Sequence, residues 1–153
     1  MIYISKYISY AEATRSTEAA HKGIKNDPDK EAIENMRRVA VEIFDRVRGF
    51  FGVPIKVNSF YRSPVVNNLV GGSATSDHVK GCAIDVKAIA NSGITNKDIF
   101  EYVRSNCEYD QLIWEHGNNK QPAWVHFSKR AIGNRMQVLQ AKKVNGKTVY
   151  VEY

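Results

Sequence analysis

The stretch that decides the fold is Ser76-Asp77-His78-Val79-Lys80-Gly81-Cys82-Ala83-Ile84-Asp85, which offers an imidazole and a carboxylate seven residues apart. If residues 81–88 form a strand, the alternation of side chains puts Asp85 on the same face as the small residues Gly81 and Ala83. Asp85 then faces the same space as the histidine, over residues too small to block a bound ion. The opposite face of this strand is predicted to be core.

A second imidazole follows in Trp124-Val125-His126-Phe127-Ser128, an apolar run that predicts another strand. His78, Asp85 and His126 together offer two nitrogen ligands and one oxygen ligand, the number that catalytic zinc sites use while leaving the fourth position to water. A lone histidine in a loop is usually a surface residue. A carboxylate that faces the core side of a strand, however, needs a partner. The combination therefore predicts a site for one zinc ion per chain.

The first stretch also resembles the first metal motif of the M15 peptidases. The matching residues are Ser76, His78, Gly81, Ala83 and Asp85. Members of this family are zinc D-alanyl-D-alanine carboxypeptidases and L-alanyl-D-glutamate endopeptidases, several of them phage lysins. The resemblance implies a hydrolase, a zinc metallopeptidase of the carboxypeptidase or endolysin kind that takes part in cell wall degradation.

Three further motifs resemble the family in the expected order, so that the likeness runs from about residue 10 to residue 130. They are Phe60-Tyr61-Arg62-Ser63-Pro64 with Asn67 and Gly71-Gly72, then residues 109–115, then residues 124–126. The resemblance implies that Arg62 holds a substrate carboxylate or carbonyl oxygen. From its position alone, Arg62 could equally be a solvated loop residue without a role in binding. Ser76 is expected to bind substrate or, with Asp77, to shape the metal site.

The general base is the part of the site that the resemblance leaves open. Many family members place the catalytic acid three residues before the last histidine, where this chain has Ala123, and others have a second histidine where this chain has Trp124. Glu115 is the preferred candidate because it is an acid on the strand expected to pair with the last ligand's strand. Asp110 and His116 are weaker alternatives. A salt bridge at the strand end is nearly as good an interpretation of Glu115.

Composition limits the function classes. The 153 residues, 43% hydrophobic and 25% charged, suit a single domain over 1–153, expected to be a monomer. The net charge of +6 suits an anionic wall polymer. The basic residues occur at most in pairs rather than concentrated in one patch, so no nucleic-acid partner is expected. A metal nuclease is kept only as a distant hypothesis.

No apolar run approaches 18 residues, so no membrane span is expected, and the first residues lack the pattern of a signal peptide. Synthesis in the cytoplasm is therefore expected. The resemblance implies action at the wall after release, as phage lysins do, unless export takes an unknown route. Cys82 and Cys107 are expected to be small buried residues rather than a disulfide framework or zinc ligands.

The pattern of elements predicts an α+β fold, an antiparallel sheet that carries the zinc site and is backed by helices, and the resemblance implies a hedgehog/D-Ala-D-Ala peptidase-like arrangement. Asp27 and Pro28 predict the start of a long helix that ends at Gly52. Its expected apolar stripe is Ile33, Met36, Ala40, Ile43, Phe44, Val47 and Phe50. A capping box predicts a second helix over 95–104. The expected strands cover 55–60, 81–88, 109–115, 123–128, 136–142 and 148–153.

Two functions from different classes remain open on the sequence. The first is a zinc-dependent peptidase that hydrolyses amide bonds in peptidoglycan stem peptides. The second is a non-catalytic zinc-containing domain of the same fold that binds the wall or a protein, which Ala123 in place of an acid favours. The bond that would be cut, D-Ala-D-Ala, L-Ala-D-Glu or a cross-bridge, depends on loops such as 63–77 and 116–122.

Overall fold

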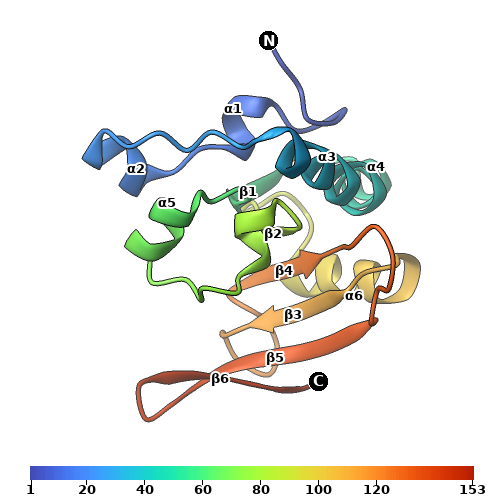
Figure 1. Cartoon of the computed structure of the whole chain (residues 1–153). Coiled ribbons are helices and arrows are strands. Elements are labelled where there is room, and N and C mark those ends of the chain that lie inside the picture. Colours follow the sequence, from blue (N-terminus) through green and yellow to red (C-terminus); the bar gives the residue numbers. More distant parts are fainter.

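A six-stranded sheet organises the computed structural model, which describes residues 1–153 (Figure 1). From one edge to the other its strands are β1 (Ile55–Ser59), β2 (Ala83–Ala88), β4 (Trp124–Ser128), β3 (Gln111–Glu115), β5 (Gln137–Val144) and β6 (Lys147–Glu152). All neighbours run antiparallel except β3 and β5, which run parallel. The predicted α+β class is confirmed. The sheet is only mostly antiparallel, because the chain leaves β4 and passes to the far side of β3.

The helices lie along the chain between these strands. They are α1 (Tyr10–Ala13), α2 (Thr17–Lys22), α3 (Lys30–Val39), the π-helical η1 (Ala40–Phe44), α4 (Asp45–Phe51), α5 (Pro64–Leu69), the 3₁₀ turn η2 (Asp77–Lys80) and α6 (Asn96–Asn106). Figure 1 shows α3 and α4 beside the β1 edge and α6 behind the middle strands, with the β5–β6 hairpin at the opposite edge. None of the helices is both long and apolar enough to cross a bilayer.

The long helix begins two residues later than the sequence indicated. Asp29, not Asp27, is its N-cap, and its carboxylate accepts a hydrogen bond from the Ala32 N–H at 2.8 Å. The helix continues through η1 into α4 as one rod with a π-helical turn. Most of the predicted stripe is buried, namely Met36, Ala40, Ile43, Phe44 and Val47, while Ile33 is half-buried against the core. The prediction that Phe50 belongs to the buried stripe is wrong, since Phe50 is 67% exposed and packs edge-on against Phe51.

The two faces of the sheet have different environments because side chains alternate along each strand. One face packs on the helices and forms the main core. The largest fully buried side chains of this core come from the strands and from the helices, and they include Trp114, Phe127, Ile84, Leu112, Phe44, Met36, Ile43, Phe100 and Ile99. The opposite face carries Asp85, His126 and Glu115. The core thus fixes the strands that present the candidate site.

The expected pairing of the strands that carry Glu115 and His126 and the expected capping box are confirmed. Strands β3 and β4 pair antiparallel, with Glu115 opposite Trp124. Asn145 and Gly146 have φ values of 51° and 77° and close the β5–β6 hairpin, as expected of a two-residue turn with both residues left-handed. The capping box at Thr95 and Asp98 is present at the start of α6, which runs two residues beyond Arg104.

Gly81 has a different role from the one predicted, which was to leave room for an ion on the strand of Asp85. Gly81 does not lie on the strand of Asp85, which begins at Ala83; it closes η2 with a left-handed φ of 76°. A Cβ at this position would lie 2.5 Å from the backbone oxygen of Ala32 and 2.8 Å from Cγ of Met36. Gly81 is therefore required so that η2 can lie against α3, rather than to leave room for an ion.

We predict that Gly81→Ala destabilises the protein more than Gly133→Ala. Both glycines have φ near 75°, so each alanine has about 1–2 kcal/mol of backbone strain. Only at Gly81 does the methyl group also meet a backbone atom, which adds about 1–3 kcal/mol of overpacking. Urea denaturation of both variants measures the difference, and equal losses of stability would contradict the packing argument.

Candidate metal centre

Three side chains from three separate elements converge on the face of the sheet opposite the core. Asp85 on β2 and His126 on β4 lie directly opposite each other in the antiparallel register, so their side chains share one face. His78 reaches the same place from η2. One ligand atom from each residue lies within 4.8 Å of the other two. The structure thus brings together the three residues that the sequence proposed as metal ligands.

The ring of His78 is held in one orientation. Its Nδ1–H donates to the carbonyl oxygen of Phe60 at 2.7 Å, just after β1. The other ring nitrogen, Nε2, faces Asp85 Oδ2 at 3.3 Å and is the nitrogen left to bind a metal ion. The turn itself is fixed because the Ser76 hydroxyl accepts a hydrogen bond from the His78 backbone N–H. Metal-binding histidines depend on this kind of support from the second nitrogen.

The carboxylate of Asp85 has little contact with solvent, since its side chain is 15% exposed. Burial alone would raise its pKa, but the charge of His78 and the hydrogen bond from His126 lower the pKa well below its usual range. The Nδ1–H of His126 donates to Asp85 Oδ1 at 2.9 Å. Burial lowers the pKa of His126, and the hydrogen bond and charge of Asp85 outweigh this and raise it. The cluster is built around a retained negative charge that attracts cations.

The donor set fits a zinc ion. Two imidazole nitrogens and one carboxylate are among the ligands that Zn²⁺ takes, and three protein ligands leave a position for water or substrate. The side chains of His78, Asp85 and His126 all line one cleft. Cys82 is a free, buried cysteine, and the group of possible ligands does not include it. The residues that would hold zinc are therefore His78, Asp85 and His126.

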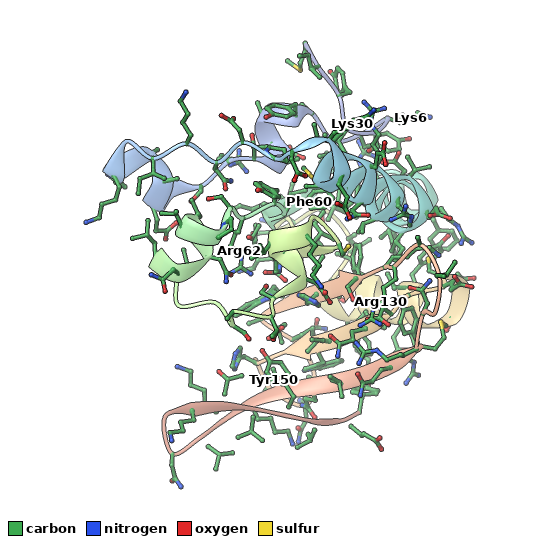
Figure 2. All side chains as sticks on the ribbon, viewed as in Figure 1. Lys6, Lys30, Phe60, Arg62, Arg130 and Tyr150 are labelled. Carbon is green, nitrogen blue, oxygen red and sulfur yellow. The ribbon has the colours of Figure 1, made fainter.

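The cleft over these ligands has a volume of about 800 Å³. In Figure 2 Arg62 and Tyr150 lie on opposite sides of strands β3 and β4, and both line the cleft. Ile113 and Leu139 form an apolar part of its lining, in a small cluster separate from the main core. The space is large enough for a peptide rather than for an ion alone.

Glu115 lines the same cleft on the face that holds the ligands. It is 6% exposed, and this burial raises the pKa of its carboxyl group to about 7, with Asp85 raising it further and His126 opposing the shift. An acid with a pKa near neutrality can both accept and release a proton at physiological pH. Glu115 is therefore a candidate acid–base group in this cleft.

The two alternatives to Glu115 differ in their surroundings. Asp110 is fully buried and outside the cleft lining. It accepts two hydrogen bonds from the side chain of Arg135, at 3.0 and 2.8 Å, and also pairs with Arg130. Although burial raises its pKa, the hydrogen bonds from Arg135 lower the pKa below its usual value. His116 does line the cleft, with its Nε2 3.9 Å from Glu115 Oε2. The geometry thus favours Glu115.

Arg62 lies beside the cleft and is partly buried. Burial lowers its pKa, while the negative charge of Asp85 raises it. Its Nε is buried without a hydrogen-bond partner. The guanidinium packs next to Gly72, where a Cβ would clash with Oδ1 of Asn67 and lie 3.0 Å from Nη1 of Arg62. Ser76 and Asp77 also line the cleft.

Sequence reasoning missed the wall of the cleft that comes from the end of the chain. These residues are Arg135, Gln137, Leu139, Thr148 and Tyr150, together with Gln111 on β3. The alternation within β5 and β6 shows which of them share a face. Nothing in the sequence indicates that β5 pairs with β3, because that parallel pairing joins segments that no short turn connects.

Comparison with known protein families identifies one family whose model matches most of this chain. The family model described as Peptidase M15 matches residues 6–128, which include every proposed metal ligand, Arg62 and Glu115. No curated protein matches the chain. The segment after residue 128, including β5 and β6, lies outside the matched region.

We predict that Glu115→Gln stabilises the metal-free protein at high pH. The pKa of Glu115 is raised from 4.5 to about 7 on folding, so ionising it in the folded state costs stability. The cost is absent below about pH 4.5, grows between pH 4.5 and 7, and reaches about 3 kcal/mol above pH 7.

Urea denaturation in a chelator at pH 4.5 and pH 8 measures this difference. Glu34→Gln, on the exposed side of α3, is the matched control and should follow the unaltered protein at both pH values. A Glu115→Gln variant that gains no stability at pH 8 would contradict a strongly shifted carboxyl group.

Proposed function

The chain belongs to the peptidase M15 family, and from that premise we propose that it is a zinc-dependent hydrolase of amide bonds in peptidoglycan stem peptides. The observation that carries the proposal is the convergence of His78, Asp85 and His126 at a cleft that also holds the buried Glu115. A structural zinc site is usually closed by four protein ligands, whereas this one offers three and faces open space.

Each group has a proposed role in amide hydrolysis. A zinc ion held by the three ligands would supply Lewis-acid chemistry, polarising the scissile carbonyl and making water more acidic. Glu115 takes the proton of the attacking water and delivers it to the nitrogen of the leaving amine. The raised pKa of Glu115, about 7, supports this double use because the carboxylate binds a proton without retaining it too strongly.

Arg62 is proposed to hold the substrate. Its guanidinium lines the cleft, and Asp85 does not neutralise it by a direct ion pair, since Asp85 is engaged with the two histidines. A guanidinium binds a carboxylate through two parallel hydrogen bonds, and stem peptides carry carboxylates. The net charge of +6 also favours approach to the anionic wall, where we propose that the protein acts after release from the cell that makes it.

A second candidate function is a non-catalytic zinc-containing domain with the hedgehog/D-Ala-D-Ala peptidase-like fold that binds wall or protein. Ala123 favours it, because many relatives carry the catalytic acid there. In this chain the Ala123 N–H donates to the Glu115 carbonyl oxygen, so Ala123 lies beside Glu115, just before β4. Glu115 itself lines the cleft, so an acid is present next to this position, which supports the peptidase.

We predict that the zinc-loaded protein cleaves stem peptides and that Glu115→Gln slows the reaction by ~10²–10⁴-fold, the usual contribution of a positioned acid–base group. Purified sacculi and the pentapeptide L-Ala-γ-D-Glu-L-Lys-D-Ala-D-Ala are digested, and the fragments are identified by mass spectrometry. The fragment masses also show which bond is cut. Glu34→Gln serves as control and should keep the full rate.

Two results would count against this account. Full activity in Glu115→Gln would show that another group, with His116 the nearest, is the base. A zinc-loaded protein that binds sacculi without releasing any fragment would favour the binding domain.

A further inference from the structure

The C-terminal hairpin forms one wall of the cleft, although it lies outside the segment that matches the family model. Strand β5 pairs in parallel with β3, the strand that carries Glu115, and β6 then forms the edge of the sheet. Figure 1 shows this hairpin on the far side of β3 from β2 and β4. The matched segment therefore supplies the proposed metal ligands, and the hairpin closes the cleft on the other side.

One row of paired residues leads from the hairpin to Glu115. In the strand registers Glu115 lies opposite Ala141, and Ala141 lies opposite Tyr150, so all three side chains share the face of the cleft. Ala141 is fully buried and carries only a methyl group. A small residue in the middle strand leaves space over β5 through which the long side chain of Tyr150 can extend toward Glu115. In the adjacent row the larger Leu139 fills the corresponding place.

The surroundings of the Tyr150 hydroxyl agree with this direction. Tyr150 is 54% exposed, so only part of its side chain is buried in the cleft. That partial burial raises its pKa first, the negative charges of Glu115 and Asp85 raise it further, and Arg62 opposes the shift. The phenol thus lies within electrostatic reach of the proposed base, a proposed metal ligand and the proposed substrate arginine. A tyrosine phenol is protonated at neutral pH even without this shift, so the hydroxyl is a hydrogen-bond donor. No hydrogen bond from a side chain contributes to this shift.

We infer that Tyr150 is a substrate-binding residue whose phenolic hydroxyl donates a hydrogen bond to a carbonyl or carboxylate oxygen of the stem peptide, across the cleft from Arg62. The inference rests on the proposed function. It adds a specificity-determining contact that the family-matched segment does not contain. The peptide would lie between the loop that carries Arg62 and the β5–β6 hairpin, with the metal ligands at the side of β2 and β4.

A second tyrosine on the same hairpin provides a matched control. Tyr153 follows β6 and points to the opposite face of the sheet, where its ring stacks on Trp114 with 5.6 Å between centroids and lies tilted against Phe100 at 4.9 Å. Tyr153→Phe removes the same hydroxyl group from the same region without altering the cleft. A general effect of the hairpin on stability would therefore appear in both variants.

The test compares Tyr150→Phe with Tyr153→Phe in two assays. Hydrolysis of the pentapeptide L-Ala-γ-D-Glu-L-Lys-D-Ala-D-Ala gives kcat/KM. Binding of the same peptide is measured without turnover in the zinc-loaded Glu115→Gln protein, by calorimetry and by the fluorescence of Trp124, which lines the cleft. We expect Tyr150→Phe to weaken binding and to lower kcat/KM by about tenfold or more, as for loss of one hydrogen bond. Zinc content and Tm should not change, and Tyr153→Phe should match its parent.

The outcomes separate the inference from the proposed function. If the unaltered protein hydrolyses the peptide and Tyr150→Phe binds and hydrolyses it equally well, the inference is overturned while the peptidase remains. If both tyrosine variants lose activity together with Tm, the effect belongs to hairpin stability and the inference is overturned. If the unaltered zinc-loaded protein neither binds nor cleaves the peptide, the proposed function fails and the inference fails with it.

Discussion

The structure of the site depends on the antiparallel pairing that places Asp85 directly opposite His126. A carboxylate with so little solvent is costly unless positive charge or hydrogen bonds compensate it. Here the compensation comes from two histidines, one on the neighbouring strand and one on the preceding 3₁₀ turn. Without a cation the three groups are stabilised only by shared protons. The arrangement therefore favours metal binding, since a divalent ion would satisfy all three ligands at once.

The packing of helices on the sheet and the contacts of η2 hold His78, Asp85 and His126 in position. The helices α3, α4 and α6 pack on one face of the sheet and fix the strands, so the other face can remain polar and open. Gly81 allows η2 to lie against α3, which brings His78 to the end of β2. The hydrogen bond between His78 and the Phe60 carbonyl oxygen then connects the metal site to the chain just before Arg62. The apolar core on one face of the sheet thus fixes the strands that position the candidate metal ligands on the other face.

Much of this could be predicted from the sequence because it depends on short-range patterns. The spacing of His78 and Asp85, the strand around His126 and the turn at Asn145-Gly146 each contain their own signal. The start of the long helix was misplaced because Asp27 and Asp29 are both plausible caps by residue type, and only the backbone conformation distinguishes them. The wall formed by β5 and β6 was missed because parallel pairing with β3 is a long-range event with no local signature. For the same reason Tyr150 was not recognised as part of the cleft.

The central claim is that His78, Asp85 and His126 form a single zinc site, and metal analysis tests it most directly. Elemental analysis by plasma mass spectrometry is made on the unaltered protein, on His78→Ala and on His21→Ala, whose histidine is exposed on α2. The account predicts about one zinc per chain in the unaltered protein and in His21→Ala, and none in His78→Ala. No zinc in the unaltered protein even after reconstitution, or undiminished zinc in His78→Ala, would contradict it.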